Sequence, residues 1–358
     1  MKAGEKMREM WIPYDQIEGR DHALDQWQLI DVRSPGEYRE GTIGEAINLP
    51  IFGDELRAEV GTAYKKQSVL EAKRRAIKAV SAQLPELYEH FLSIEATGRP
   101  IAMFCARGGM RSQSFASLLR AIGHNVCVIE GGYKAYRQYM LQALHELSQT
   151  RRFIVLHGNT GVGKTLILNR LEAQGLDVID IEALAHHRGS MLGRVGLEPQ
   201  PTQKTFEDRL YRALKGSRSG DVFVEAESKR LGRVNIDDAV LAGMRGGRHI
   251  FVDAPMWFRE REIVSEYTRH ESSKAELLTV MDNFRKHLGN EAVDQFEALI
   301  RADDYGPVAR VLMERYYDPK YEYTSVQYDY DLKVWVESVE DAVQEIRRWY
   351  EHQAVTDK

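Results

Sequence analysis

Two short stretches of the sequence hold residues with distinct chemical abilities. Residues 104–112 read FCARGGMRS, which sets one cysteine, Cys105, in a run of glycines and arginines. Residues 157–165 read HGNTGVGKT, a glycine-rich run that ends in lysine and threonine. The first stretch offers a sulfur nucleophile and the second a phosphate site, so any function assigned to the chain has to use both.

The second stretch satisfies the phosphate-binding pattern G-x-x-x-x-G-K-[ST]. It follows the apolar run FIVLH, an expected strand, and precedes KTLILNRLEAQG, an expected helix. Glycines let successive backbone N–H groups point at an anion, and the start of the helix adds partial positive charge. Lys164 is expected to reach the outer phosphate. The predicted diphosphate-binding residues are Gly158, Asn159, Thr160, Gly161, Val162, Gly163, Lys164 and Thr165.

A metal ion is expected beside these phosphates, held by Thr165 and by an acid at the end of a neighbouring strand. Three carboxylates follow apolar runs in this part of the chain: Asp180, Glu225 and Asp253. The predicted metal ligands are Thr165 together with Asp180 or Glu225, and Mg²⁺ is the expected ion. Arg259 and Arg261 are candidate cations that close over a transferred group. The motif indicates a diphosphate or triphosphate ligand, which need not be ATP.

Cys105 follows the apolar run IAMF and precedes the predicted helix SQSFASLLRAIG. A thiol in that place faces backbone N–H groups, a helix N-terminus and two arginines, all of which favour the thiolate. Cys105 is therefore the predicted nucleophile. Cys127, within NVCVIE, is interpreted as a buried structural cysteine. The predicted anion loop around Cys105 consists of Arg107, Gly108, Gly109, Arg111 and Ser112.

The loop spacing and the flanking sequence point to different families. C-x5-R followed by serine is the spacing of cysteine phosphatases, whereas a rhodanese loop usually has one residue fewer before its arginine. Phe104, however, stands where those phosphatases carry histidine. The flanks LIDVRSPGEYREGTIGEAINLPIF and VIEGGYKAYR resemble the opening signature and the closing glycine pair of rhodanese-like domains. The resemblance implies a rhodanese-like domain with an enlarged anion loop.

Alternating apolar and helical runs are the elements that must position both stretches. Expected strands in the first half are QLIDV, AINLPI, IAMFC and NVCVIE, and those in the second half are FIVLH, LDVIDI, DVFVEAE and HIFVDA. This alternation predicts an α/β protein with parallel sheets. We expect a rhodanese-like parallel-sheet domain over residues 1–145, with a helical insertion at about 54–95. A P-loop NTPase/kinase-like parallel-sheet domain follows over 146–358, with a helical C-terminal extension.

Length and composition restrict the class of protein. A chain of 358 residues is long enough for two domains, and with only two cysteines neither domain is expected to need a disulfide. The net charge of −5 excludes the uniformly basic surface of a chromatin or ribosomal protein. No apolar run is long enough to cross a bilayer, and nothing at the start resembles a signal peptide. We therefore expect a cytoplasmic protein without a membrane partner.

The chain as a whole resembles the bacterial tRNA 2-selenouridine synthases. The likeness rests on CARGGMRS, VGTAYKKQS and GLEPQPTQKTFEDRL, and it extends over essentially the full length. It implies a transferase that acts on tRNA carrying 2-thiouridine at the wobble position. S-geranylation by geranyl diphosphate comes first, and selenium from selenophosphate then replaces the geranylthio group. The resemblance also implies that Cys105 carries selenium as a selanylsulfide, and we expect a monomer.

The sequence is also compatible with other functions. Taken separately, the two motifs predict a cysteine-dependent phosphatase or sulfurtransferase fused to a P-loop kinase-like domain. A nucleotide-gated sulfur carrier or RNA-binding module, and an enzyme restricted to geranylation, are further alternatives. Candidate tRNA contacts are the basic segment from Lys65 to Lys78 and the arginines near the P-loop. Tyr316, Tyr317 and Tyr321 are candidates to stack on a base or line a geranyl pocket, or else are ordinary core and surface tyrosines.

Overall fold

The computed structural model describes residues 10–19, 26–320 and 328–356. The chain divides into two compact units, Met1–Ala143 and Leu144–Lys358, and each is described by itself. The boundary between them falls inside one long helix, α7 (Gly132–Thr150). No described helix is both long enough and apolar enough to span a membrane.

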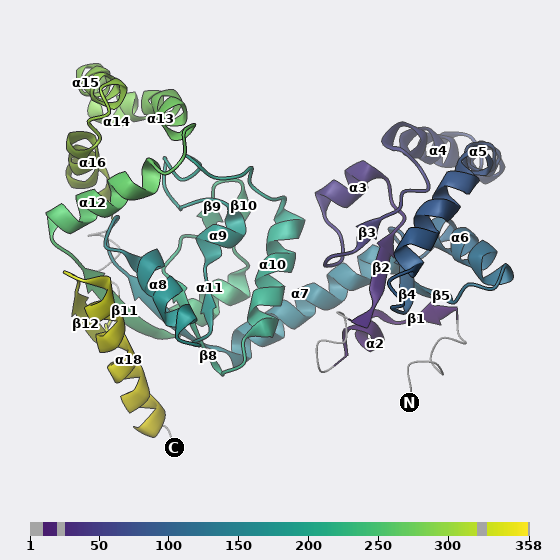
Figure 1. Ribbon diagram of the computed structural model, residues 1–358, viewed down its shortest axis with the longest axis horizontal. Helices are drawn as coiled ribbons and strands as arrows, with labels where there is room; N and C mark the ends of the chain where they lie inside the picture. The colour runs from purple at the N-terminus through teal and green to yellow at the C-terminus, as the bar shows by residue number, and fades with distance from the viewer. Residues whose placement is uncertain (1–9, 20–25, 321–327, 357–358) are drawn as a thin grey trace. The chain divides into compact units, whose positions relative to one another are not determined.

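The first unit is built on a five-stranded sheet whose strands all pair in parallel (Figure 1). The strand order is β1-β5-β4-β2-β3. Every residue of the three central strands is buried, as expected for a parallel sheet covered by helices on both faces. The strands are β1 (Trp11–Ile12), β2 (Gln28–Asp31), β3 (Ile47–Asn48), β4 (Ile101–Phe104) and β5 (Val126–Ile129).

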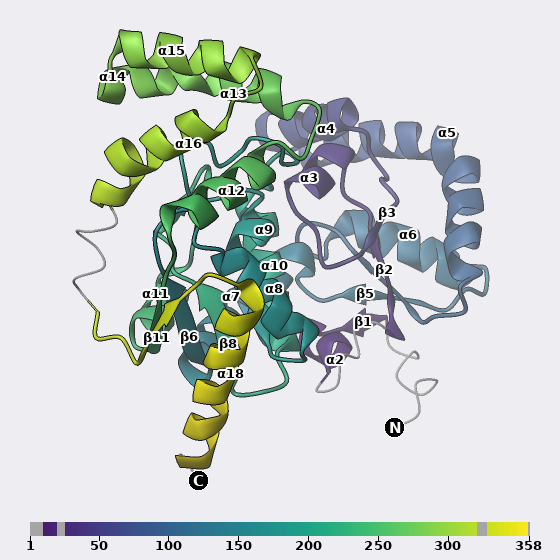
Figure 2. The same ribbon diagram turned by 60° about the vertical axis from the view of Figure 1, so that its left-hand side comes forward.

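The helices of the first unit include a hairpin that corresponds to the predicted insertion. It consists of α4 (Asp54–Lys66) and α5 (Val69–Glu95). Pro85 lies inside α5, where it removes one backbone donor, and Figure 2 shows that α5 changes direction along its length. Beyond the proline, Phe91 packs edge-on against Phe115 of α6, at 6.5 Å between ring centroids. The other helices are α2 (Tyr14–Glu18), α3 (Pro35–Glu40) and α6 (Met110–Ala121).

The second unit holds another five-stranded parallel sheet, in the order β12-β11-β6-β8-β7. Its strands are β6 (Arg152–His157), β7 (Val178–Ile179), β8 (Asp221–Glu225), β11 (Arg248–Asp253) and β12 (Leu332–Trp335). A separate antiparallel pair consists of β9 (Arg230–Leu231) and β10 (Val234–Asn235). The helices beside this sheet are α8 (Lys164–Ala173), α9 (Ile181–Ala185), α10 (Gln203–Gly216) and α11 (Asp238–Arg245). The α/β class and the order of the two domains are as predicted.

The C-terminal region differs from a purely helical extension. Most of residues 256–317 form helices, drawn in green in Figure 2. They contribute most of a hydrophobic cluster that also includes Leu192 and Val195. The chain then returns to the sheet as edge strand β12, which pairs with β11, and as α18 (Val339–Thr356), which packs on α8. The helical elements are α12 (Met256–Tyr267), α13 (Ser273–Met281), η2 (Asp282–Phe284), α14 (Arg285–Leu288), α15 (Asn290–Arg301), α16 (Gly306–Leu312) and η3 (Met313–Tyr317).

Candidate active site

Cys105 lies at the carboxyl end of β4, where the chain turns toward α6. Its side chain is buried, and its sulfur accepts hydrogen bonds from two donors. The backbone N–H of Gly109 and the hydroxyl of Ser112 each lie 3.2 Å from Sγ. Donors of this kind stabilise negative charge on sulfur. The structure therefore brings Cys105, Gly109 and Ser112 of the predicted loop into direct contact.

Glycines let the loop approach the turn after β5. Gly108 has φ of +61°, and a β-carbon there would lie 2.8 Å from the carbonyl oxygen of Ile129. A β-carbon at Gly132 would collide with the carbonyl oxygen of Cys105. That same oxygen accepts a hydrogen bond of 2.9 Å from the backbone N–H of Tyr133. The cysteine loop thus packs directly on the backbone of the glycine pair that closes the signature, Gly131 and Gly132.

The two loop arginines occupy different environments. Arg111 donates to both carboxylate oxygens of Glu37 in α3, at 2.6 and 3.2 Å. Burial acts to raise the pKa of Glu37, but the hydrogen bonds and charge of Arg111 outweigh it and lower the pKa to about 2. Arg107 is exposed and makes no hydrogen bond or ion pair within the described residues. Of the two, Arg107 is the cation with an uncommitted guanidinium, whereas an anion reaching Arg111 has to compete with Glu37.

The signature before the loop supplies the frame that holds Glu37. Arg33 pairs with Asp31 at 2.5 Å, donates to the carbonyl of Gly41 at 2.6 Å and lies 3.9 Å from the ring centroid of Tyr133. Ser34 caps α3 by accepting from the backbone N–H of Glu37, whose carboxylate accepts from the N–H of Ser34 in return. These signature residues therefore act by positioning α3.

Glu37→Gln is expected to destabilise the first unit by about 1–3 kcal/mol, because it leaves the mostly buried Arg111 without a charged partner. Since the pKa of Glu37 is lowered to about 2, its contribution is complete above about pH 4.5 and is lost as the pH falls toward 2. Urea unfolding at pH 7 and at pH 3 measures both effects. The matched control is Glu45→Gln, an exposed site without a described partner, which should change stability by less than about 0.5 kcal/mol. Equal stability of wild type and Glu37→Gln at pH 7 would contradict the role of this pair.

The phosphate-binding motif joins β6 to α8 as predicted from its flanks. Gly158, Gly161 and Gly163 have positive φ angles of 148°, 84° and 84°. A β-carbon at Gly161 would lie 2.8 Å from the carbonyl oxygen of Arg259 in α12, so the loop packs closely on that helix. Lys164 begins α8, and its Nζ donates to the carbonyl of Gly158 at 3.0 Å. The side chain therefore lies across the loop, as in P-loop proteins.

The arginines considered as closing cations have other partners. Arg259 is buried, and its Nε donates to the carbonyl of Thr160 at 2.9 Å. Its two terminal nitrogens bind the carboxylate of Asp318 at 2.5 and 3.0 Å. Arg261 pairs with Glu262 at 2.8 Å. Arg259 consequently anchors the P-loop to residues that follow η3 and is not free to reach a ligand.

An acidic cluster lies beside the P-loop strand. Carboxylate oxygens of Glu182, Glu225 and Glu227 lie within 4.8 Å of one another. Glu225 ends β8 and is paired in register with Leu156 of β6, two residues before the P-loop begins. The side chain of Glu225 is buried, and its Oε1 has no hydrogen-bond partner within the described residues. A buried carboxyl oxygen without a partner, next to two other carboxyl groups, is a site where a cation would be favourable.

The pKa values of the three carboxyl groups are raised, as expected for acidic side chains that are buried close to one another. Burial, followed by the charge of neighbouring carboxylates, raises the pKa of Glu225 and of Glu182 well above the ordinary value. The same two causes raise the pKa of Glu227 to about 8. The positive charge of Lys164 acts in the opposite direction on all three. The charge of Lys164, whose side chain lies across the P-loop, therefore also favours the ionised form of the three carboxylates.

Only one of the cluster residues was singled out by sequence reasoning. Glu225 was a candidate, whereas Glu182 and Glu227 were missed, although each lies two positions after a candidate carboxylate in the runs DIE and EAE. Asp180 is not among these three residues; its Oδ1 caps α9 by accepting from the N–H of Ala183 at 2.8 Å, and its charge contributes to the raised pKa of Glu225. Thr165 is the second residue of α8. For Glu227 the missed signal was its two-residue spacing from Glu225, which returns side chains to the same side of an extended chain, whereas Glu182 lies in helix α9 and no such spacing rule applies to it.

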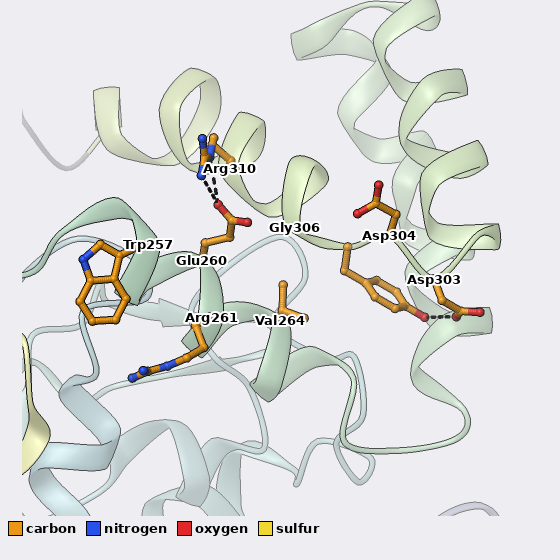
Figure 3. A pocket seen from close by; sticks show the side chains of 9 residues that line it. Trp257, Glu260, Arg261, Val264, Asp303, Asp304, Gly306 and Arg310 are labelled. Atoms are coloured by element: carbon orange, nitrogen blue, oxygen red, sulfur yellow. Dashed lines mark hydrogen bonds and ion pairs between the residues drawn. The ribbon is translucent and has the colours of Figure 1, made fainter.

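A hollow of about 380 Å³ lies between α12 and the segment that leads into α16 (Figure 3). Charged side chains line much of it: Arg310 pairs with Glu260 at 2.7 Å, and the hydroxyl of Tyr305 donates to Asp303 at 2.9 Å. Such a lining is unsuited to a prenyl chain. Tyr316 and Tyr317 are buried in the helical core, which matches the interpretation of ordinary core residues. Tyr321 lies outside the described residues.

Comparisons with known proteins match both units. Residues 151–356 match the family described as the tRNA 2-selenouridine synthase AAA domain, and residues 16–139 match the rhodanese-like domain. A tRNA 2-selenouridine synthase of Marinobacter nauticus is 32% identical over 85% of this chain and 90% of that protein. The chain belongs to the tRNA 2-selenouridine synthase family. Synthases of the same name from Shewanella halifaxensis (30% identity; 87% of this chain, 90% of that protein) and Nitrosomonas europaea (38%; 67% and 63%) are also similar.

The two chemical centres fall one in each matched region of this tRNA 2-selenouridine synthase family member. The Cys105 loop lies within the rhodanese-like match, and the P-loop with its acidic cluster lies within the AAA-domain match. The cysteine loop and the P-loop therefore lie in separate matched regions of one chain.

Proposed function

We propose that this protein converts 2-thiouridine to 2-selenouridine at the wobble position of tRNA in two steps. The observation that carries the proposal is the presence, in one member of this family, of a buried cysteine in a loop of donors and a P-loop beside an acidic cluster. The relatives are named for the synthesis of 2-selenouridine in tRNA. A reaction at the cysteine loop alone would give the P-loop no role, and a reaction at the P-loop alone would give the cysteine no role, whereas a two-step exchange uses both.

In the first step, the P-loop binds the diphosphate of geranyl diphosphate. The thiocarbonyl sulfur of 2-thiouridine attacks C1 of the geranyl group, the carbon–oxygen bond breaks, and diphosphate leaves with the bonding electron pair. Backbone N–H groups of the loop and the ammonium of Lys164 stabilise the charge that develops on the leaving group. N3 then loses its proton to solvent, so the thiolactam becomes a neutral S-geranyl thioimidate, whose geranylthio group is a better leaving group than sulfur alone.

The residues beside the P-loop fit a divalent metal, and Mg²⁺ is the ion we propose. Glu225 offers a buried oxygen without a partner, with Glu182 and Glu227 next to it, and Thr165 occupies the P-loop position that can ligate Mg²⁺. When bound, Mg²⁺ would neutralise charge on the diphosphate leaving group. The carboxylates hold and orient it, and Lys164 screens their mutual repulsion.

Glu225→Gln is expected to weaken Mn²⁺ or Mg²⁺ binding by about tenfold or more, because it replaces the buried anionic ligand by a neutral amide of the same shape. Mn²⁺ titration followed by electron paramagnetic resonance measures the affinity without any turnover. Because the pKa of Glu227 is raised to about 8, a cation has to displace its proton at low pH. Metal affinity should therefore rise as the pH increases toward 8 and level off above it.

The matched control for this substitution is Glu198→Gln, an exposed site without a described partner. It should bind Mn²⁺ as the wild type does. Wild-type affinity in Glu225→Gln, or metal affinity that does not change between pH 6 and pH 9, would remove the acidic cluster from the proposal.

In the second step, the cysteine loop holds selenophosphate. Arg107 supplies an uncommitted cation for the phosphate group, and the N–H of Gly109 donates to the sulfur of Cys105. That sulfur is the nucleophile directed at the phosphorus of the donor: an S–P bond forms and the P–Se bond breaks, which releases selenide to attack C2. Over the whole step a C2–selenium bond forms and the C2–sulfur bond breaks. Geranylthiolate leaves and takes a proton, and water converts the phosphoryl group of the donor to phosphate. The overall exchange needs no oxidant or reductant.

One reaction tests the function as a whole. The protein is incubated with 2-thiouridine tRNA, geranyl diphosphate and selenophosphate, and the digested nucleosides are weighed by mass spectrometry. S-geranyl-2-thiouridine should form first and 2-selenouridine later. The rival enzyme, a cysteine phosphatase fused to a kinase, would instead hydrolyse an aryl phosphate and consume ATP. Those two activities without modified nucleosides would overturn the proposal.

A further inference from the structure

Exposed cations without partners gather on the α4–α5 hairpin. Lys65 and Lys66 end α4, and Lys73, Arg74 and Lys78 lie on the first half of α5. All of these side chains are exposed, and within the described residues none makes a hydrogen bond or an ion pair. Each therefore keeps its full charge available to a ligand.

Three arginines of the same unit, by contrast, are paired with carboxylates. Arg39 pairs with Asp54 at 3.1 Å, and Arg57 pairs with Glu37 at 3.5 Å. Arg75 pairs with both Glu59 and Glu71 at 2.9 Å, so these two carboxylates of the hairpin already have a cationic partner. The five unpaired cations of the hairpin thus form a local concentration of positive charge on a chain of net charge −5.

Large apolar side chains are exposed among these cations. Leu70 is 59% exposed, Ile77 69% and Tyr64 52%. Leu70, Lys73, Arg74, Ile77 and Lys78 follow the spacing i, i+3, i+4, i+7, i+8, so they share one face of α5. The opposite face contains Ala72, which is buried, and Ala76 and Val80, which pack against the hydrophobic core of the first unit. We define the exposed face, with Tyr64, Lys65 and Lys66, as the hairpin patch.

We infer that the hairpin patch binds the phosphodiester backbone of tRNA. The inference rests on the proposed function, in which tRNA is the substrate, and the argument is charge complementarity between unpaired cations and a polyanion. Tyr64, Leu70 and Ile77 provide surface for riboses and unpaired bases between the phosphate contacts. An anionic membrane fits less well, because a membrane-bound helix separates its apolar and basic faces, whereas here both kinds of side chain share one face.

The direct test is binding of 2-thiouridine tRNA to the full-length protein by filter retention at several salt concentrations. The variant K73E/R74E/K78E should weaken binding by about tenfold or more and reduce the salt dependence of log Kd by about two to three. K73R/R74K/K78R keeps the charge and should bind like the wild type. R218E/R245E/K286E makes the same charge change at exposed cations of the second unit that have no described partner, and it should have a smaller effect.

The results of these binding measurements distinguish failure of the inference about the hairpin patch from failure of the proposed function. If wild type and K73E/R74E/K78E bind tRNA equally well, the patch inference fails while the function stands. If the wild type does not bind tRNA at all, both fail. Binding to vesicles of phosphatidylglycerol and phosphatidylcholine is measured as well. If the wild type binds these vesicles and K73E/R74E/K78E does not, while tRNA binding is the same for both, the hairpin patch binds a lipid surface instead.

Discussion

Replacing Lys164 by alanine is expected to reduce S-geranylation of 2-thiouridine tRNA by about 100- to 1,000-fold, the usual loss when a group that stabilises leaving-group charge is removed. The ammonium of Lys164 lies across the P-loop and acts electrostatically on all three carboxylates of the acidic cluster. Its removal deprives the diphosphate of its nearest cation and leaves the carboxylates to repel each other. Initial rates of S-geranyl-2-thiouridine formation, measured on digested tRNA, give the size of the loss.

Two controls separate chemistry from folding in this experiment. Lys286→Ala removes an exposed lysine that has no described partner and should geranylate at the wild-type rate. Pre-geranylated tRNA bypasses the first step, so Lys164→Ala should still convert it to 2-selenouridine when selenophosphate is present. Normal geranylation by Lys164→Ala would remove the P-loop from the prenyl-transfer step.

Replacing Cys105 by serine is expected to let geranylated tRNA accumulate while 2-selenouridine formation falls by about 100-fold or more, because a serine hydroxyl is not ionised at neutral pH. The substitution changes little else. Serine fits where Sγ accepts from Gly109 and Ser112, and the P-loop lies in the other unit. The ratio of geranylated to selenated nucleoside after a fixed time is the measurement.

Cys127 provides the matched control for that substitution. It is buried in β5, burial raises the pKa of its thiol to about 12, and its Sγ lies 3.4 Å from the carbonyl of Ile101. Cys127→Ser should lower stability but leave the ratio of the two products unchanged. If Cys105→Ser incorporates selenium at the wild-type rate, the cysteine loop is not the selenation centre. If it also loses geranylation, the two steps are not divided between the units as proposed.

Much of the fold followed from local pattern. Buried runs such as IAMF and VFV are too apolar for an edge position, and their alternation with helices predicted the parallel sheets that were found. The strand β12 was missed because LKVW is only four residues long and lies within a segment rich in charge; Lys333 and Trp335 are exposed, and only Val334 is buried. It became a strand because the backbone of β11 offered an unpaired edge, which is a property of the assembled sheet.

The sequence by itself determined where the two loops lie and which backbone conformations they adopt, since glycine positions and helix starts act over a few residues. Only the tertiary structure decided which charges those loops meet. Glu37 reaches Arg111, Asp318 reaches Arg259, and Glu182 joins Glu225, each across 43 or more positions of chain. The physical reason is that such pairings depend on how separate elements pack, and no spacing rule extends over those distances.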